Sequence, residues 1–234
     1  MRIVLIHGQN HKGSSYNIGR LIEKAVTCEK EVTEFFLPKD LNYFCCGCYG
    51  CINGDDNCPC YSQKKVIMDA VESADLLIFT TPTYCMRASG PMKSFIDLTF
   101  TYWMVHRPRS SMFSKRAVVV STAAGAGAGS AVKDISTALS YWGIPYIKKL
   151  GFAVQAMGWD NVNSKKKEKI EKAANKLGKK LTASSGKKPF VGIKTRFLFN
   201  MMGLMQKGGM GSSPYEKEYW EKQGWFNGKR PWKQ

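Results

Sequence analysis

The sequence lacks an apolar run long enough to cross a membrane. Its amino-terminal apolar run, residues 3–6, is shorter than the core of a signal peptide, and no other segment approaches the roughly 18 apolar residues of a membrane span. We therefore expect a cytoplasmic protein with no transmembrane span. Cysteines in that compartment stay reduced.

The sequence also lacks the glycine patterns of two common nucleotide-binding classes. Its first glycine-rich stretch, residues 8–19, has neither the Gly-x-Gly-x-x-Gly spacing of a dinucleotide fingerprint nor the Gly-Lys-Ser/Thr ending of a Walker loop. These absences argue against a Rossmann dinucleotide domain and against a P-loop nucleotide hydrolase.

Acidic residues are scarce in the last part of the chain. Residues 148–234 carry 20 Lys and Arg but only six Asp and Glu, and the whole chain has a formal net charge of +17. Such a field can attract nucleic acid, anionic lipid or phosphorylated cofactors, although it does not decide the fold. A solvated basic face is the simplest interpretation, and we do not expect nucleic-acid binding.

Cysteine, in contrast, is present and concentrated. The chain has 234 residues, of which 44% are hydrophobic, and a chain of this length buries a sufficient core without a disulfide or a structural metal. Reduced thiols at high density therefore indicate metal binding or redox chemistry. Six of the eight cysteines lie within sixteen residues, at Cys45, Cys46, Cys48, Cys51, Cys58 and Cys60.

Short apolar runs alternate with longer amphipathic stretches, which is the pattern of βαβ units around a parallel sheet. The predicted fold is an α/β three-layer sandwich with a five-stranded parallel sheet over residues 1–184, followed by a basic, apolar and aromatic C-terminal extension over 185–234. We predict strands over residues 2–6, 32–37, 76–80, 117–121 and 147–154, and helices over 15–27, 64–73, 91–100, 131–142 and 164–181.

Three loops follow the first, third and fourth predicted strands. The first, residues 8–17, opens a helix and offers N–H and hydroxyl donors to a phosphate, although Ser14 or Ser15 could instead act as the helix N-cap. The second, residues 81–91, carries flat and polarizable side chains suited to a planar heterocycle, and the third, 122–130, lets backbone approach a ligand closely. In a sheet of order 2-1-3-4-5 these loops share the edge where the winding reverses and ligands bind.

Three motifs together resemble one known family. They are His11-Lys12-Gly13-Ser14-Ser15-Tyr16-Asn17, then Pro82-Thr83-Tyr84 followed by Gly90-Pro91-Met92-Lys93-Ser94-Phe95-Ile96-Asp97, and the Cys-x-Gly-Cys-x-x-Cys run at 45–51. Over residues 1–184 the chain resembles the flavodoxin-like NAD(P)H-dependent FMN reductases, including their iron–sulfur flavoprotein branch.

The resemblance implies FMN as the cofactor and NAD(P)H as the reducing substrate. It places the FMN phosphate on the first loop and the isoalloxazine ring against the other two. Gln9 and His11 depart from the serine and the basic residue that many members carry there. The implied cofactor-binding residues are Gln9, His11, Ser14, Ser15, Tyr16 and Asn17 in the first loop, Pro82, Thr83, Tyr84, Cys85, Met86, Arg87 and Ala88 in the second, and Thr122, Ala123, Ala124 and Gly125 in the third.

The cysteine run leaves three interpretations open. The spacing Cys45-x2-Cys48-x2-Cys51-x6-Cys58 resembles the ligation of a [4Fe–4S] cluster. Zinc fits the ligand count but would usually show two separated Cys-x2-Cys pairs. Free or redox-active thiols are the third interpretation, since the additional cysteines leave any ligand assignment ambiguous.

These features predict an FMN-dependent NAD(P)H oxidoreductase that passes hydride to flavin N5 and then reduces a small-molecule acceptor such as a quinone, a nitro compound or a flavin. The hydride step requires no acid or base side chain, so we assign no catalytic residue. The alternative is a non-enzymatic electron-transfer flavoprotein, with or without an iron–sulfur cluster, that serves a protein partner.

The C-terminal extension carries too many apolar side chains for all of them to remain exposed to solvent. Lys194, Arg196 and Asn200 interrupt it, so it cannot form a span, although a basic amphipathic segment could lie on a membrane surface. We expect it to mediate self-association into a homodimer or homotetramer. Its apolar residues include Phe190, Phe197, Leu198, Phe199, Met201, Met202, Leu204 and Met205.

We expect the purified protein to bind FMN in preference to FAD. The three loops define one mononucleotide site, and the sequence offers no second half for an adenine nucleotide. Cofactor released by denaturation and identified by chromatography should be FMN, and apoprotein should bind added FMN more tightly than FAD. Release of FAD, or apoprotein that takes up neither flavin, would contradict this prediction.

Overall fold

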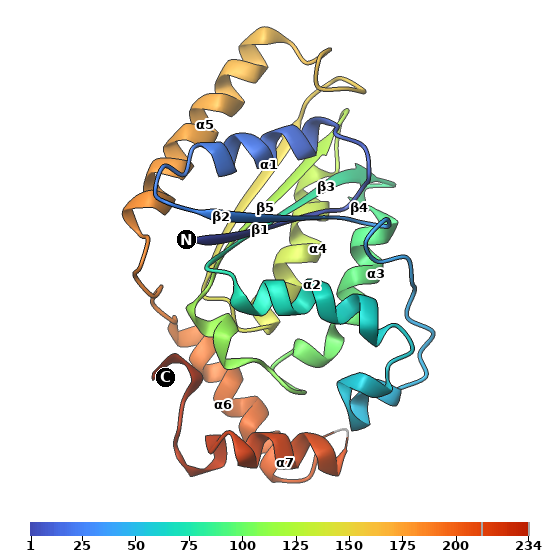
Figure 1. Cartoon of the computed structure of the whole chain (residues 1–234), viewed down its shortest axis with the longest axis vertical. Helices are drawn as coiled ribbons and strands as arrows, with labels where there is room; N and C mark the ends of the chain where they lie inside the picture. The colour runs from blue at the N-terminus through green and yellow to red at the C-terminus, as the bar shows by residue number, and fades with distance from the viewer. Residues whose placement is uncertain (212, 234) are drawn as a thin grey trace.

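The computed structural model describes residues 1–211 and 213–233, and a parallel β-sheet lies at its centre (Figure 1). The sheet order β2-β1-β3-β5-β6 matches the predicted 2-1-3-4-5, and this flavodoxin-like α/β fold is confirmed. A short additional strand, β4 (Arg87–Ala88), pairs antiparallel with the end of β3. The parallel strands are β1 (Arg2–His7), β2 (Glu31–Phe36), β3 (Leu76–Tyr84), β5 (Arg116–Ala123) and β6 (Tyr146–Ala153).

Helices cover both faces of the sheet, and they lie where the sequence predicted them, with ends shifted by a few residues. Two of them, α1 and α5, cover one face, and three, α2, α3 and α4, cover the other (Figure 1). Their bounds are α1 (Ser14–Lys24), α2 (Tyr61–Ser73), α3 (Gly90–Leu98), α4 (Ala128–Tyr141) and α5 (Ser164–Ala183).

The central strands are continuous apolar runs because both of their faces are buried. In β1, Ile3 and Leu5 pack into the layer under α1 and α5, while Val4 and Ile6 pack into the layer under α2, α3 and α4. This alternation follows from the two-residue period of a strand. The two hydrophobic layers therefore cover the two faces of the sheet, and the loops that follow the strands lie at its carboxyl edge.

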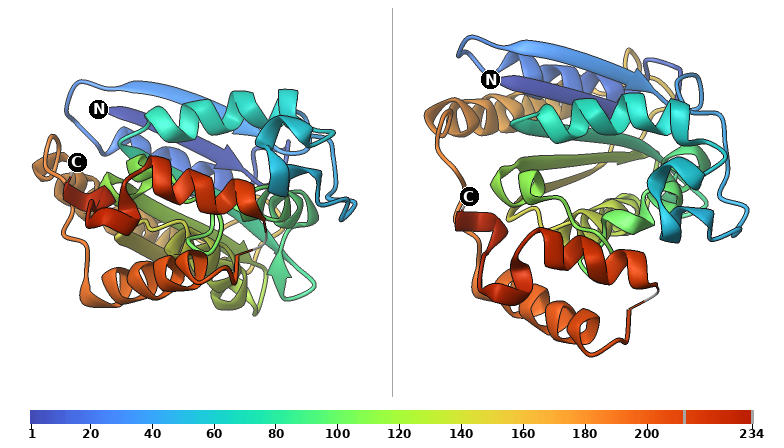
Figure 2. Two further views of the ribbon diagram at one scale, coloured as in Figure 1. Left: turned by 90° about the horizontal axis from the view of Figure 1, so that it is seen from below. Right: turned by 60° about the horizontal axis from the view of Figure 1, so that its bottom comes forward.

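The C-terminal extension folds back onto its own chain. It forms α6 (Ile193–Lys207) and α7 (Pro214–Lys222), which lie against the α2 and α3 side of the molecule (Figure 2). Phe199 is 1% exposed and packs with Trp220 and Trp225 against Met104 and Phe113 of the α/β domain. Part of the apolar surface that we expected to drive self-association is therefore buried within the chain, because the extension carries its own tryptophans to cover it.

A buried arginine connects the extension to the loop after β2 that carries six cysteines, residues 45–60, which we call the cysteine loop. Arg107 is 1% exposed; it donates to the backbone carbonyl of Cys51 at 2.5 Å and pairs with Asp55 at 2.7 Å and with Glu216 of α7 at 3.3 Å. Burial opposes the ionisation of Asp55, but Arg109 and Arg107 outweigh it and hold the pKa of that carboxyl below its usual value. Because each buried charge has a partner, α7 and the cysteine loop stay in one arrangement.

No helix within residues 1–211 and 213–233 is long and apolar enough to cross a membrane.

We expect Phe199→Ala to destabilise the protein, whereas Phe197→Ala should not. Phe199 is fully buried among aromatic rings, so its truncation leaves a cavity that costs about 3–5 kcal/mol. Phe197 lies two residues earlier on the same helix and is 65% exposed, so its truncation should change the free energy of unfolding by about 0.5 kcal/mol or less. Urea denaturation of both variants measures the difference, and equal effects would show that the extension does not dock as described.

Candidate functional site

The loops that follow β1, β3 and β5 meet at the carboxyl edge of the sheet. The N–H of Gly8 donates to the carbonyl of Thr80 at 2.7 Å, which carries the β1–β3 pairing to the last residue before the first loop. Ser89, which is fully buried, donates its hydroxyl to the carbonyl of Gly8 at 2.7 Å and its N–H to Thr81 Oγ1 at 3.0 Å. The first and second loops are therefore held together by hydrogen bonds.

Sequence reasoning missed Ser89 and Thr81. Ser89 stands immediately before Gly90-Pro91, a position that is typical of a helix N-cap. In the structure its side chain does not cap α3 but bonds across to Gly8. A Cβ on Gly8 would lie 2.6 Å from Ser89 Oγ, so only glycine permits this approach. Ser89 does stand at the N-cap position of α3, but its hydroxyl bonds to a residue that is remote in the sequence.

The amino terminus of α1 is the centre of the first loop. Gly13 occupies the N-cap position, and no side chain caps the helix, so the alternative of a serine cap is wrong. Ser14 and Ser15 instead lie buried in the first turn. The N–H groups of that turn and the positive end of the helix dipole form a seat for an anion.

The other predicted phosphate-loop residues divide into structural and exposed groups. Asn17 donates its amide to the carbonyls of Lys12 and Gly13, at 3.0 and 2.9 Å, and so closes the loop. Gln9 and Tyr16 are half-buried, while His11 is exposed. Lys12 is also exposed and was not among the predicted binding residues; its Nζ lies 5.7 Å from the Tyr16 ring centroid. An exposed cation therefore lies in the loop that leads into the amino terminus of α1.

A buried histidine forms the floor beneath this loop. His7 ends β1, and its Nδ1 lies 2.8 Å from Thr80 Oγ1, with its ring 4.9 Å from Tyr16 and 4.7 Å from Phe36. Burial lowers the pKa of His7 to about 4, although Glu34 opposes the shift. The imidazole is therefore neutral at pH 7 and acts as a packing group.

The second loop is a β-hairpin. Thr83 pairs with Ala88 and Tyr84 with Arg87, and the two turn residues, Cys85 and Met86, have φ of 48° and 65°. Left-handed backbone at both central positions is the geometry of a type I′ turn. It costs about 1–2 kcal/mol per residue when neither is glycine, and such strain concentrates at functional sites.

The hairpin projects its side chains from the edge of the sheet. Pro82 and Thr83 are half-buried and Ala88 is buried, whereas the rest are exposed. Arg87 pairs with Asp134 of α4 at 3.0 Å, which anchors the returning strand to a helix. The four exposed residues are Tyr84, Cys85, Met86 and Arg87.

The third loop touches the hairpin from the other side. Thr83 Oγ1 lies 2.9 Å from Ser121 Oγ, and a Cβ on Gly127 would lie 2.9 Å from Met86 Cα. Thr122 and Ala123 are buried within β5, so only Ala124 and Gly125 of the predicted residues reach the surface. A Cβ on Gly125 would meet nothing within 4 Å, so this loop borders open space.

The four predicted cluster ligands line one cavity but differ in exposure. Cys45 and Cys48 are exposed on the loop after β2, while Cys51 and Cys58 lie in the hydrophobic core. Cys58 Sγ instead lies 3.6 Å from Cys60 Sγ, and burial raises the pKa of Cys60 to about 11. Among the described residues, no group of three or more His, Cys, Asp or Glu side chains is arranged to hold a metal ion.

The cysteines surround a cavity of about 580 Å³. Aromatic side chains form much of its wall, namely Tyr43, Phe44, Tyr49 and Phe100. Ser94 Oγ donates to the carbonyl of Tyr43 at 2.5 Å, which fastens the start of the loop to α3. The wall of this cavity therefore combines cysteine thiols with aromatic rings.

Comparison with known proteins identifies the family of this chain and supports its fold. A family model described as NADPH-dependent FMN reductase matches residues 1–157. The azoreductase of Bacillus anthracis strain Sterne superposes with a TM-score of 0.55 at 14% identity, covering 78% of this chain and 98% of that chain. The NADH:FMN oxidoreductase EMOB in its apo form superposes with a TM-score of 0.57 at 16% identity, covering 84% and 98%.

An FMN-dependent NADH-azoreductase from Bacillus anthracis strain Ames Ancestor, solved in complex with FMN, has a TM-score of 0.54 at 13% identity and covers 76% of this chain and 100% of that chain. At these identities the likeness to solved structures shows the fold alone. The comparison with curated proteins finds no match.

We expect thiol accessibility to divide the cysteine loop. Cys45, Cys46 and Cys48 are exposed, whereas the other three cysteines of the loop are buried. Brief alkylation of the native protein, read by peptide mass spectrometry, should label the exposed group about tenfold faster or more, because buried thiols react only through local opening. Unfolding in urea should abolish the difference. Uniform protection of all six, together with stoichiometric iron and sulfide, would contradict the structure and assign a cluster.

Proposed function

Because the chain belongs to the family of NADPH-dependent FMN reductases, we propose that it reduces a second small molecule with electrons taken from NAD(P)H through FMN at the carboxyl edge of its sheet. Family membership makes it an NAD(P)H-dependent FMN oxidoreductase. The observation that carries the finer proposal is the uncapped amino terminus of α1 lying beside an exposed hairpin.

The first loop fits the phosphate of FMN. A phosphate needs several donors and a positive potential, and the first turn of α1 supplies both without competition from a side-chain cap. The hydroxyls of Ser14 and Ser15 lie in that turn, and exposed His11 and Lys12 stand at its mouth. The helices α3 and α4 also begin at this edge without a side-chain cap, but α1 is the one whose first turn carries two serines and whose preceding loop carries His11 and Lys12.

The second and third loops fit the flavin ring. Tyr84 and Met86 are 46% and 55% exposed on the strained hairpin, so they offer flat and polarizable surface. Gly125 faces open space on the opposite side. The hydrogen bonds from Ser89 and Thr83 fix the spacing of the three loops, so the ring would meet a preformed seat.

When bound, FMN supplies the redox chemistry, because it takes two electrons and a proton from a nicotinamide and gives them to an acceptor such as a quinone, a nitro compound or a second flavin. The protein would bind the flavin, orient it and shield it from water. We assign no acid or base to the reaction, since His7 is neutral and buried and the charge of Arg87 is paired with Asp134.

The proposed electron transfer does not involve an iron–sulfur cluster. The four cysteines that resemble cluster ligands line one cavity, but among the described residues no three His, Cys, Asp or Glu side chains are arranged to hold a metal ion, so we assign none of them as a ligand. The electron-carrier alternative has no observation in its favour. We propose that the reaction takes place in the cytoplasm, where NAD(P)H is available and the thiols remain reduced.

We expect Ser15→Asp to weaken FMN binding about tenfold or more. A carboxylate in the first turn of α1 repels the phosphate, although it is favourable to the helix dipole. Because Ser15 is buried, the melting temperature of the apoprotein is measured alongside the affinity. Ser62→Asp is the matched control, because Ser62 holds the same second position in α2 and is exposed. Flavin fluorescence measures both affinities.

Exposed His11→Glu places the same charge at the mouth of the loop and guards against a folding defect at Ser15. In the unmodified protein, anaerobic NADH or NADPH should bleach the bound flavin, and a quinone should restore its absorbance. Wild-type affinity in both loop variants would refute the phosphate site, and flavin that resists both nicotinamides would refute the reductase.

A further inference from the structure

One face of α6 is apolar and uncovered. Ile193, Phe197 and Leu204 are 82%, 65% and 72% exposed, and their spacing of four and seven residues puts them on one stripe of the helix. We call these three residues the α6 stripe. Phe190, 74% exposed, continues it before the helix begins. The opposite face holds Phe199 and packs on the protein, so the stripe points away from the core.

The surroundings of the α6 stripe carry charge of one sign. Residues 187–207, which contain the stripe, carry five Lys and Arg and no Asp or Glu. Lys187 and Lys188 are exposed before the stripe, and Lys207 is exposed at its far end. An apolar strip between cations is the composition of helices that lie in a membrane interface.

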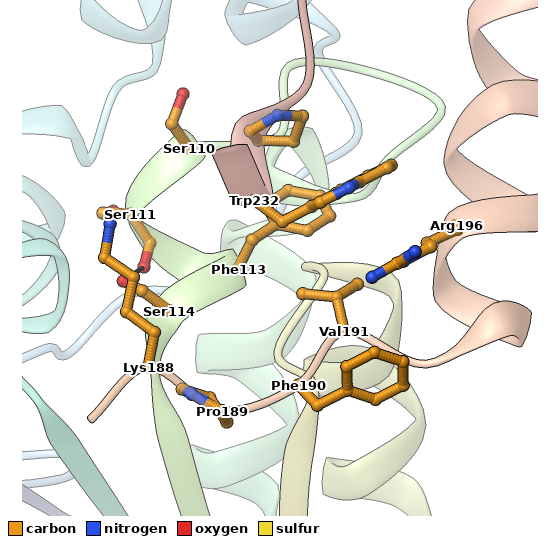
Figure 3. A pocket seen from close by; sticks show the side chains of 11 residues that line it. Ser110, Ser111, Phe113, Ser114, Lys188, Pro189, Phe190, Val191, Arg196 and Trp232 are labelled. Carbon is orange, nitrogen blue, oxygen red and sulfur yellow. Dashed lines mark hydrogen bonds between the residues drawn. The ribbon is translucent and has the colours of Figure 1, made fainter. Parts of the chain in front are cut away.

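A cavity of about 300 Å³ opens at the amino end of the stripe (Figure 3). Lys188 and Arg196 flank it on opposite sides, with Phe113 and Trp232 between them. Ser111 Oγ and Arg196 Nε, which belong to residues lining this cavity, are buried and have no hydrogen-bond partner among the described residues. Two unmet donors in a cationic pocket suit the oxygens of a phosphate.

We propose that this face docks the protein on an anionic lipid bilayer. The α6 stripe and Phe190 enter the interface between headgroups and acyl chains, the flanking lysines face anionic headgroups, and the cavity takes one lipid phosphate. Apolar insertion and electrostatic attraction reinforce one another, since either signal alone gives weak binding.

The charge distribution selects a bilayer over a second copy of the chain. A two-fold interface sets the same patch against itself, so the five cations of residues 187–207 in one copy would face the same five in the other. A nucleic acid would satisfy the lysines but leave Ile193, Phe197 and Leu204 in water. An anionic membrane satisfies both sets of side chains at once.

Docking leaves the flavin site open. Residues 110–114 of the cavity wall precede β5, whereas the third cofactor loop follows it, so the two sites lie at opposite ends of that strand. Lipid and FMN therefore bind without competition, and the enzyme would work at a membrane surface with its active site facing water.

The test is co-sedimentation of the FMN-loaded full chain with vesicles of phosphatidylcholine alone or with about a third of the lipid replaced by phosphatidylglycerol. The protein should bind the anionic vesicles, and raising the salt concentration should weaken binding. The double variant Phe197→Ser and Leu204→Ser should lose about tenfold or more of the affinity, because both side chains are exposed and contribute only through the membrane.

A matched control removes two equally exposed apolar side chains elsewhere. Val66→Ser with Met157→Ser, at 62% and 94% exposure, should bind as the unmodified protein does. Arg196→Gln should lower affinity for anionic vesicles only. All variants should keep FMN and reductase activity, since none lies in the cofactor loops.

Three outcomes would overturn the proposal. The first is absence of binding to anionic vesicles at low salt, and the second is equal binding by the stripe variant and the control. The third is a dimer, measured by light scattering, that the stripe variant loses while vesicle binding persists, which would assign the stripe to a second copy of the chain.

Discussion

The parallel pairing of β1 with β3 is the constraint on which the site depends. In that ladder His7, the last residue of β1, pairs with Thr80, so the first loop leaves the sheet beside the last residues of β3. These two strands are the point where the chain reverses its winding, because β2 lies beyond β1 and β5 lies beyond β3. A uniform set of parallel strands thus delivers three loops to one edge, and every later contact of the cofactor site refines that placement.

Buried polar contacts then convert this placement into fixed geometry. Ser89 reaches across to Gly8, Thr83 reaches across to Ser121, and Asn17 closes its own loop. Each bond is short-range in space but joins segments that are distant in the chain, except for Asn17. The strained turn at Cys85 and Met86 persists because the antiparallel pair around it and the ion pair of Arg87 hold both of its ends.

The C-terminal extension shows how one helix can serve two purposes. Its inner face completes an aromatic cluster with Trp220 and Trp225, and Glu216 of the next helix meets Arg107 beneath the cysteine loop. Its outer face remains apolar and bordered by cations. A helix that is apolar on both sides needs two partners, and the protein itself supplies only one of them.

The sequence by itself indicated the α/β fold class, the loops of the candidate site and the family, because apolar period, glycine-rich loops and short motifs are local signals. It could not show the hairpin at Cys85 and Met86, since neither residue is a usual left-handed turn former, nor the bond from Ser89 to Gly8, which joins residues far apart in the chain. The cysteine spacing suggested a cluster, and only the structure showed that Cys51 and Cys58 are buried while Cys45 and Cys48 are exposed on the same cavity. Tertiary structure alone decided these points, because they depend on which remote groups reach a side chain, and sequence spacing contains no information about that.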